Sequence, residues 1–365
     1  ALFIVAVAGM FGYRFMKPYL QDAVQRNTSD ASATKGKITL AYDNWVGYVP
    51  ICSSEMKRAM RNSGWILNCE DDGADYGKRM ERLKNGELDF AVATVDSFIL
   101  NAAKFDFPGV IIIVIDKSWG GDAILAKSEY AANLNALKGK KDLKVAFTPS
   151  SPSHHLLKAA AYHFDIPELL PSNKQNRFET SGSEDALKLF QSGKVEVAVL
   201  WEPDVSRALA DKGVIKLLGT EDTEGLIVDI LIVNRNYSDR NPEVVEQFIN
   251  SYFRVLKDYR ENPDKLVKEV IAQNNKPESK LSEDTVRMML KGVAWVSLTE
   301  NATKWFGISV FGVKTETGLV DTIDSSLGIL MASGDFNTSP IPDNDPYRLT
   351  YSKYIEDLSK KGVSG

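Results

Sequence analysis

The sequence has few of the residues that carry redox and metal chemistry. Its 365 residues include only two cysteines and three histidines, and two of those histidines, His154 and His155, are adjacent. Adjacent residues point to different faces of a helix, so this pair does not form one metal site. The sequence also lacks an H-E-x-x-H motif, a G-x-G-x-x-G or Walker loop and a G-x-S-x-G elbow. We therefore expect no cofactor, no metal and no enzymatic activity.

Clustered positive charge is also missing. The chain carries 44 basic and 49 acidic side chains, a net charge of −5, and contains no block of lysine or arginine. Because phosphate binding needs clustered positive charge, nucleic acid is not expected as a partner. The hydrophobic fraction of 44% and the charged fraction of 25% are average for folded soluble proteins, and the length predicts two domains.

The N-terminal segment is the longest run without charge. Ala1 to Tyr13 is uncharged, and Arg14 and Lys17 follow it. The chain starts with alanine, so we expect that apolar residues precede it and that residues 1–20 are a retained signal-anchor on the outer side of the cytoplasmic membrane, periplasmic or extracellular. A cleaved signal peptide and a buried helix are the alternatives. The polar residues 21–36 are predicted to be a linker.

From Lys37 onward, short β-rich segments alternate with helical patterns, which predicts an α/β fold with a mainly parallel sheet. The first expected strands are Lys37–Asp43, Trp65–Glu70, Leu88–Ala93 and Val110–Ile115, with helices at Pro50–Ser63, Asp75–Asn85 and Asp96–Lys104. A second set has strands at Leu143–Phe147 and Val195–Leu200 and helices at Ser153–Phe164, Glu184–Gln191 and Pro203–Ala210. After these we expect a strand at Leu226–Asn234, helices at Asn241–Asn262, Ser282–Leu290 and Ser352–Leu358, and a loop at Pro340–Pro346.

Two segments of the chain resemble each other. When Leu83–Ser97 is aligned with Leu189–Pro203, Gly86 matches Gly193 and Asp89 matches Glu196. A helix, a glycine and an acid-bearing buried strand therefore recur, which predicts two similar lobes.

Cys52 and Cys69 are both expected at the carboxyl edge of the first sheet. They could form a disulfide in an oxidising compartment, or they could be two small buried hydrophobic residues; the sequence leaves both open.

Four segments resemble the type II periplasmic solute-binding proteins of ABC importers, specifically the group that binds nitrate, sulfonates, taurine and thiamine precursors. They are AYDNWVGYVP (Ala41–Pro50), GELDFAVATVD (Gly86–Asp96), LKGKKDLKVAFTPSSPSHHLL (Leu137–Leu157) and AVLWEPD (Ala198–Asp204). The resemblance implies two Rossmann-like α/β lobes joined by two crossings, with ligand in the cleft. Lobe 1 would comprise residues 37–121 and 227–365, and lobe 2 residues 122–226. It also implies delivery of the ligand to an ABC-transporter permease.

Ligands in open α/β sheets bind beyond the carboxyl ends of strands. Applied to the expected strands, this rule gives a set of candidate ligand-binding residues: Asp43, Trp45, Tyr48, Thr94, Asp96, Ser118, Trp119, Asp122, Thr148, Ser150, Ser151, Ser153, Trp201, Glu202 and Asp229.

The motif TPSSPS, Thr148 to Ser153, precedes a helix, so its backbone N–H groups and hydroxyls could hold an anionic group or cap the helix. The other candidates are mostly acidic, with Lys117 as the one expected cation among them, and tryptophans add cation-π surface. We therefore expect a small amine-bearing or zwitterionic ligand. The alternatives are a membrane-anchored sensor or structural part of an envelope assembly and, third, an enzyme of pyrimidine or thiamine-precursor synthesis.

Overall fold

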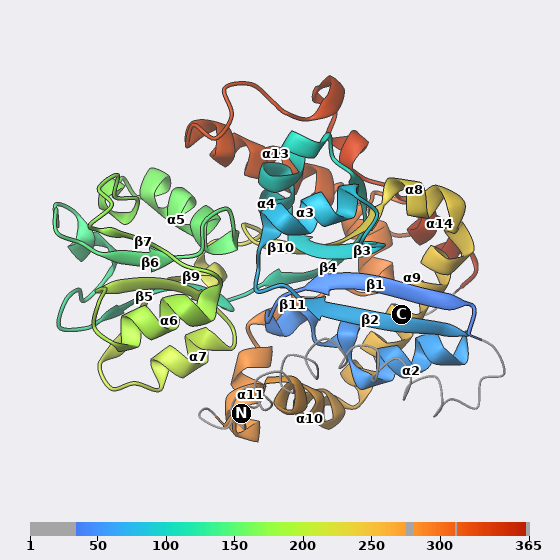
Figure 1. The fold of residues 1–365 in the computed structure, drawn as a ribbon, viewed down its shortest axis with the longest axis horizontal. Coiled ribbons are helices and arrows are strands. Elements are labelled where there is room, and N and C mark those ends of the chain that lie inside the picture. Colours follow the sequence, from blue (N-terminus) through green and yellow to red (C-terminus); the bar gives the residue numbers. More distant parts are fainter. Residues whose placement is uncertain (1–33, 275–279, 311, 363–365) are drawn as a thin grey trace, which may run out of the picture.

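The computed structural model describes residues 34–274, 280–310 and 312–362. They form two α/β lobes side by side, each built on one β-sheet (Figure 1). The expected anchor lies outside the described residues, as does most of the expected linker, although Gly36 already belongs to strand β1. In the described ranges, no helix combines the length and apolar character needed to cross a membrane.

The sheet of the larger lobe has the strand order β11-β4-β10-β3-β1-β2. Its strands are β1 (Gly36–Tyr42), β2 (Trp65–Asp71), β3 (Phe90–Thr94), β4 (Gly109–Ser118), β10 (Val228–Asn234) and β11 (Val293–Trp295). Strand β10 is antiparallel to both β3 and β4, and β11 is antiparallel to β4. The expectation of a mainly parallel sheet is therefore wrong at its centre, because an apolar strand buried on both faces carries no signal of its direction.

Helices cover both faces of this sheet. They are α2 (Ser54–Asn62), α3 (Tyr76–Lys84), α4 (Val95–Ala102), α8 (Arg235–Arg240), α9 (Pro242–Glu261), α10 (Pro263–Asn274), α11 (Glu283–Leu290), α12 (Leu298–Glu300), α13 (Gly318–Ala332) and α14 (Lys353–Lys360). The expected helix Pro50–Ser63 is shorter than predicted. It begins as a 3₁₀ turn, η2 (Pro50–Cys52), and α2 starts only after Ser53, whose hydroxyl accepts the Met56 N–H.

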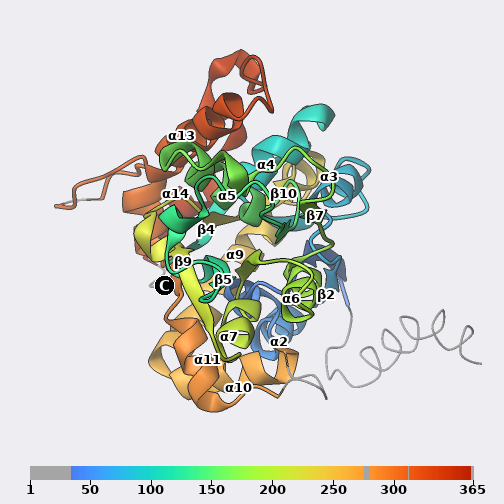
Figure 2. The ribbon, with the colours of Figure 1, turned by 90° about the vertical axis from the view of Figure 1, so that its left-hand side faces the viewer.

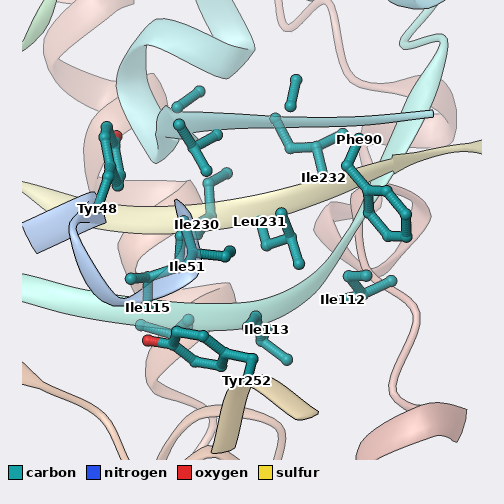
Figure 3. Packing of buried hydrophobic residues seen from close by; sticks show 14 of the residues in the cluster. Tyr48, Ile51, Phe90, Ile112, Ile113, Ile115, Ile230, Leu231, Ile232 and Tyr252 are labelled. Carbon is teal, nitrogen blue, oxygen red and sulfur yellow. The ribbon is translucent and has the colours of Figure 1, made fainter. Parts of the chain in front are cut away.

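The core of the larger lobe lies around its central strands. All residues of β10 and β3 are buried, and Figure 3 shows Ile230, Leu231 and Ile232 of β10 lying between β3 and β4. Tyr252 of α9 packs below β4, and Phe90 stacks on Phe248 with ring centroids 4.5 Å apart. Continuous apolar strands need cover on both faces, and these helices supply it.

The smaller lobe has the strand order β7-β6-β8-β5-β9. Its strands are β5 (Asp122–Lys127), β6 (Val145–Phe147), β7 (Arg177–Glu179), β8 (Val197–Trp201) and β9 (Val214–Gly219), and its helices are α5 (Pro152–His163), α6 (Ser183–Gln191) and α7 (Asp204–Leu209). Strands β5, β7 and β9 were not predicted, nor were helices α8, α10 and α13. Strand β5 is antiparallel to both β8 and β9, so this sheet is also mixed. The expected loop Pro340–Pro346 contains a 3₁₀ turn, η8 (Pro342–Asn344).

The recurrence of one unit in both lobes is visible in the structure. Gly86 after α3 and Gly193 after α6 both have φ near +72°, the left-handed conformation in which glycine often ends a helix. The matched acids also have the same role, since each accepts a backbone N–H. Asp89 accepts the N–H of Thr39 on the neighbouring strand at 2.8 Å, and Glu196 accepts that of Lys144 at 3.1 Å.

The chain passes between the sheets twice, from β4 to β5 and from β9 to β10. Helices of the larger lobe also reach the smaller one, and Figure 2, viewed from the side of the smaller lobe, shows α13 above it and α11 below it. On the α13 side, Lys158 of α5 forms an ion pair with Asp335 at 2.7 Å. On the other side, Arg207 of α7 donates to the Asn274 carbonyl at 3.1 Å. The lobes are thus in direct contact beside the crossings.

Candidate ligand site between the lobes

Asp43, directly after β1, lies in a buried ion pair. Its carboxylate accepts from Arg79 at 3.2 Å and from the Tyr76 hydroxyl at 3.1 Å. Arg79 is fully buried and also pairs with Asp72, with Nε to Oδ2 at 2.7 Å. Burial raises the pKa of Asp43, and the Arg79 guanidinium opposes that rise. Asp43 is therefore held within the larger lobe by a cation that was not identified from the sequence.

Asp116 of β4 and Asp229 of β10 face each other across an antiparallel strand pair. Trp45 Nε1 donates to Asp116 at 3.3 Å, and the Tyr48 hydroxyl donates to Asp229 at 2.5 Å. Burial raises the pKa of Asp116 to about 7. Burial and the negative charge of Asp116 together raise the pKa of Asp229 well above its usual range. Two adjacent buried carboxyls cannot both ionise easily, so we assign one proton to the pair.

The loop after β1 approaches this pair closely. A side chain at Gly47 would lie 2.2 Å from an Asp116 carboxylate oxygen and from the Trp45 indole nitrogen, and one at Gly121 would meet the Trp45 ring at 2.4 Å. Glycine is therefore required at both positions for the Trp45 indole to reach Asp116.

Trp201 and Glu202 end strand β8 of the smaller lobe. The Trp201 indole donates to Asn44 Oδ1 of the larger lobe at 2.8 Å, and the Val46 N–H donates to the Glu202 carbonyl at 3.3 Å. The Glu202 carboxylate instead accepts both the N–H and the hydroxyl of Ser206, at 3.0 and 2.6 Å, at the start of α7. Burial raises the pKa of Glu202 to about 7. Trp201 thus joins the lobes, while the Glu202 side chain supports its own helix.

In the described structure, thirteen residues have buried side-chain polar atoms without a hydrogen-bond partner. Four of them lie on segments of the two lobes that approach each other: Asp96 (Oδ1), Asp122 (Oδ1), Thr148 (Oγ1) and His155 (both ring nitrogens). Each of these four is at most 3% exposed. Asp96 lies at the start of α4 in the larger lobe, whereas the other three belong to the smaller lobe, at β5, after β6 and in α5. Since unpartnered buried polar atoms are rare, this set points to a place where a ligand or water completes the bonding.

Three of these residues are ionisable, and the charge of Asp96 acts on both Asp122 and His155. Burial raises the pKa of Asp122 to about 8, and the negative charge of Asp96 raises it further, as do Asp116 and Asp43. Burial lowers the pKa of His155, and Asp96 opposes that effect. The carboxyls at the cleft therefore act as one acidic group shared by both lobes.

The start of α5 differs from the expected cluster of free hydroxyls. The Ser151 hydroxyl donates to the Thr148 carbonyl at 2.6 Å, and the Ser153 hydroxyl to the Val199 carbonyl at 3.4 Å. Ser150 has a left-handed backbone with φ 54°, and its carbonyl accepts from Asn101 of the larger lobe at 2.9 Å. The Thr148 hydroxyl has no partner in the described structure, and Thr148 lines a pocket of about 290 Å³ together with Tyr76, Asn101 and Thr180.

The remaining candidates have local roles. Thr94 and Ser97 cap α4 reciprocally, and the Ser118 hydroxyl bonds Thr220 Oγ1 at 2.7 Å, which links the two crossings. Trp119 is 42% exposed, with Lys117 over its ring. Lys117 pairs with Glu224, so it is not the cation of the acidic group, contrary to expectation.

The residues missed from the sequence are Arg79, Tyr76, Thr220 and His155. Arg79 lies in the charged helix KRMERLK, where its residue type does not distinguish it from the half-buried Arg82. His155 was noticed only as a metal ligand to be excluded. A search for polar residues at helix starts facing the strand ends could have found His155, but none would have found Arg79.

Cys52 and Cys69 are joined in a disulfide, with Cα atoms 6.1 Å apart. Of the two possibilities that the sequence leaves open, this structure has the bonded one. The bond ties the turn before α2 to strand β2, on the side of the sheet next to the Asp43 loop.

The fold and the site geometry together define a class: the two-lobe fold of periplasmic binding proteins, with polar side chains of both lobes meeting at the carboxyl ends of the strands. No family model and no curated protein sequence matches the chain. Solved structures do match it.

The periplasmic aliphatic sulphonate-binding protein SsuA from Escherichia coli aligns with a TM-score of 0.64 and 16% identity, over 86% of this chain and 98% of that one. The alkanesulfonate-binding protein SsuA from Xanthomonas axonopodis pv. citri, bound to MOPS, aligns with a TM-score of 0.65 and 15% identity, over 86% of this chain and 98% of that one. The periplasmic nitrate-binding protein NrtA from Synechocystis PCC 6803 aligns with a TM-score of 0.62 and 12% identity, over 90% of this chain and 89% of that one. At these identities the likeness shows the fold, and it is the fold of the group that the sequence resembles.

Proposed function

We propose that this protein is an extracytoplasmic solute-binding protein that holds a small polar ligand between its lobes and delivers it to an ABC importer. The observation that carries this proposal is the set of buried, unpartnered polar atoms contributed by both lobes: Asp96 from one, and Asp122, Thr148 and His155 from the other. A ligand that bonds to both lobes stabilises their closed arrangement, because only that arrangement offers all the contacts.

The charge of the site supports an amine-bearing or zwitterionic ligand. Arg79 balances Asp43, a shared proton reduces the charge of the Asp116–Asp229 pair, and Glu202 is engaged by Ser206. Asp96 and Asp122 then remain as acceptors for a positive group. An anionic end of the same ligand would fit Thr148 and the backbone N–H groups at the start of the twelve-residue helix α5. MOPS, present in one solved relative, is itself an amine with a sulfonate tail.

The disulfide favours a location outside the cytoplasm, because such bonds persist mainly in oxidising compartments. Attachment to the membrane through residues 1–20 stays a prediction, since that segment lies outside the described residues. The same holds for the alternative of a sensor or part of an envelope assembly, which rests on that anchor.

A thermal-shift screen tests the proposal. The panel is taurine, ethanesulfonate, 4-aminopyrimidine, choline and nitrate, and we expect at least one amine-bearing compound to raise the melting temperature. Trp201→Phe removes the indole that joins the lobes and should reduce that shift, whereas Trp119→Phe, at an exposed site, should not. A panel in which only nitrate or other simple anions stabilise the protein would contradict the amine-bearing ligand. A shift that Trp201→Phe leaves unchanged would move the site away from the cleft.

A further inference from the structure

Two carboxylates at the cleft lack any compensation, and they lie on opposite lobes. Asp96 is the second residue of α4 in the larger lobe, and Asp122 is the first residue of β5 in the smaller lobe. They are 3% and 2% exposed, and each has an Oδ1 atom without a partner in the described structure. Both are therefore buried in the arrangement of the lobes that this structure has.

The groups around these two residues supply no positive charge. Asp122 is faced by Asp96 of α4, Asp116 of β4, Asp229 of β10 and Asp43. Its neutral polar neighbours are the hydroxyls of Ser118 and Thr220. Asp96 is faced by His155 of α5, which burial keeps neutral. The nearest buried cations are already engaged, Arg79 by Asp43 and Asp72, and Lys158 by Asp335.

His155 is an independent sign that something is bound here. Its ring is 1% exposed and neither ring nitrogen has a partner, although a neutral imidazole has one donor and one acceptor to satisfy. Leaving both unpaired is costly, so the surroundings of the His155 ring are suited to a polar group rather than to apolar packing.

We propose that Asp96 and Asp122 form a clamp, with one arm on each lobe, for a single cationic group that carries N–H donors, such as a primary ammonium or a protonated amidine. In the protein without ligand, a proton on Asp122 takes the place of that cation. This inference rests on the proposed solute-binding function and names the chemical group that triggers closure. A quaternary ammonium has charge but no N–H to donate, so it should not act in this way.

The titration of Asp122 sets the direction of the pH effect. Its pKa is about 8 in the closed structure, and opening would expose it to water and return its pKa towards the usual value near 4. Closure therefore takes up a proton between these two values, and rising pH favours the open form. A bound cation removes this dependence because it compensates the ionised carboxylate directly.

Small-angle X-ray scattering of the protein without ligand tests the clamp. We expect a larger radius of gyration at pH 9 than at pH 6 for the wild type, and a compact protein at both pH values for Asp122→Asn. Asp96→Asn should still expand at pH 9, but less than the wild type, because burial continues to raise the pKa of Asp122. Asp165→Asn is the control, because this acid is 93% exposed on the smaller lobe, and it should behave as wild type. At pH 9, methylammonium chloride should restore the compact form, whereas tetramethylammonium chloride at the same ionic strength should not.

Each result bears on the clamp in a definite way. A wild-type radius that is the same at both pH values, or an Asp122→Asn variant that expands like the wild type, would overturn it. Equal compaction by both salts would remove the requirement for N–H donors. The outcome for the clamp can be told apart from the outcome for solute binding. If ethanesulfonate stabilises the protein as well as taurine does, solute binding is supported and the clamp is rejected. If the protein opens with rising pH but no compound of the panel stabilises it, the clamp is supported and the proposed solute binding is not.

Discussion

Asp43 and Asp122 are both fully buried acids at the ends of strands that face the cleft, yet their surroundings differ. Asp43 accepts hydrogen bonds from Arg79, Tyr76 and the Trp45 N–H. Asp122 has one oxygen without a partner and mainly acidic neighbours. The first is part of the architecture of one lobe, and the second is available to a ligand. The comparison teaches that position at a strand end does not assign a role to a carboxylate; its nearest cation does.

The strongest way to break this comparison is to remove the cation. Arg79→Met would leave Asp43 and Asp72 buried together without compensation, which we expect to lower the free energy of unfolding by about 3–5 kcal/mol. Urea unfolding at pH 7 measures it. Arg82→Gln is the matched control on the same helix, since its partners Glu70 and Glu87 are partly exposed, and it should cost about 1 kcal/mol or less. Equal losses in the two variants would show that Asp43 is not held by Arg79.

A smaller effect is expected when the acid itself is changed. Asp43→Asn keeps the shape of the side chain but weakens the bonds from Arg79 and Tyr76, so we expect a loss of about 2 kcal/mol at pH 7, again by urea unfolding. Asp72 still pairs with Arg79 in this variant, which is why the loss is smaller than for Arg79→Met. A variant as stable as the wild type would show that the bonds from Arg79 and Tyr76 to Asp43 do not stabilise the larger lobe.

The same substitution at Asp122 should have the opposite sign. The native pKa of about 8 exceeds the unfolded value near 4, so the native state holds a proton that the unfolded state has lost. The wild type therefore loses stability as the pH rises from about 4 to about 8, and Asp122→Asn does not. We therefore expect the variant to be more stable than the wild type at pH 9. The difference should be only about 1 kcal/mol, because water that reaches the carboxylate in an opened cleft reduces the cost of its charge. Thermal unfolding at pH 5 and pH 9 measures the difference, and parallel pH profiles would refute it.

Much of the fold can be read from the sequence because its signals are local. Gly86 and Gly193 with their acid-bearing strands predict the repeated unit, and the structure confirms it, down to the amide each acid accepts. Strand directions could not be predicted, because β10 and β5 have the same apolar composition whichever way they run. Strand β5 was missed because it begins at an acid, Asp122, directly at the boundary expected between the two lobes.

The candidate site shows the same division. The rule that ligands bind at the carboxyl ends of strands selects Asp96, Asp122 and Thr148, which have unpartnered buried atoms in the described structure. It also selects Ser151 and Ser153, whose hydroxyls bond within their own lobe. It selects Trp119, which is 42% exposed. Residue type and position predict a candidate, while the partner of each polar atom depends on segments far away in the chain.

By itself, the sequence determined that this is an α/β protein with a repeated unit, that its strands are buried on both faces, and that acids and small polar residues follow those strands. Periodicity, glycine and turn chemistry are properties of neighbouring residues, and so they can be read directly. Only the tertiary structure decided which acids are paired. Arg79 lies 36 positions from Asp43, and the Asp116–Asp229 pair forms across two strands that are distant in the chain. Pairing depends on distances of a few ångströms between such residues, and only folding sets those distances.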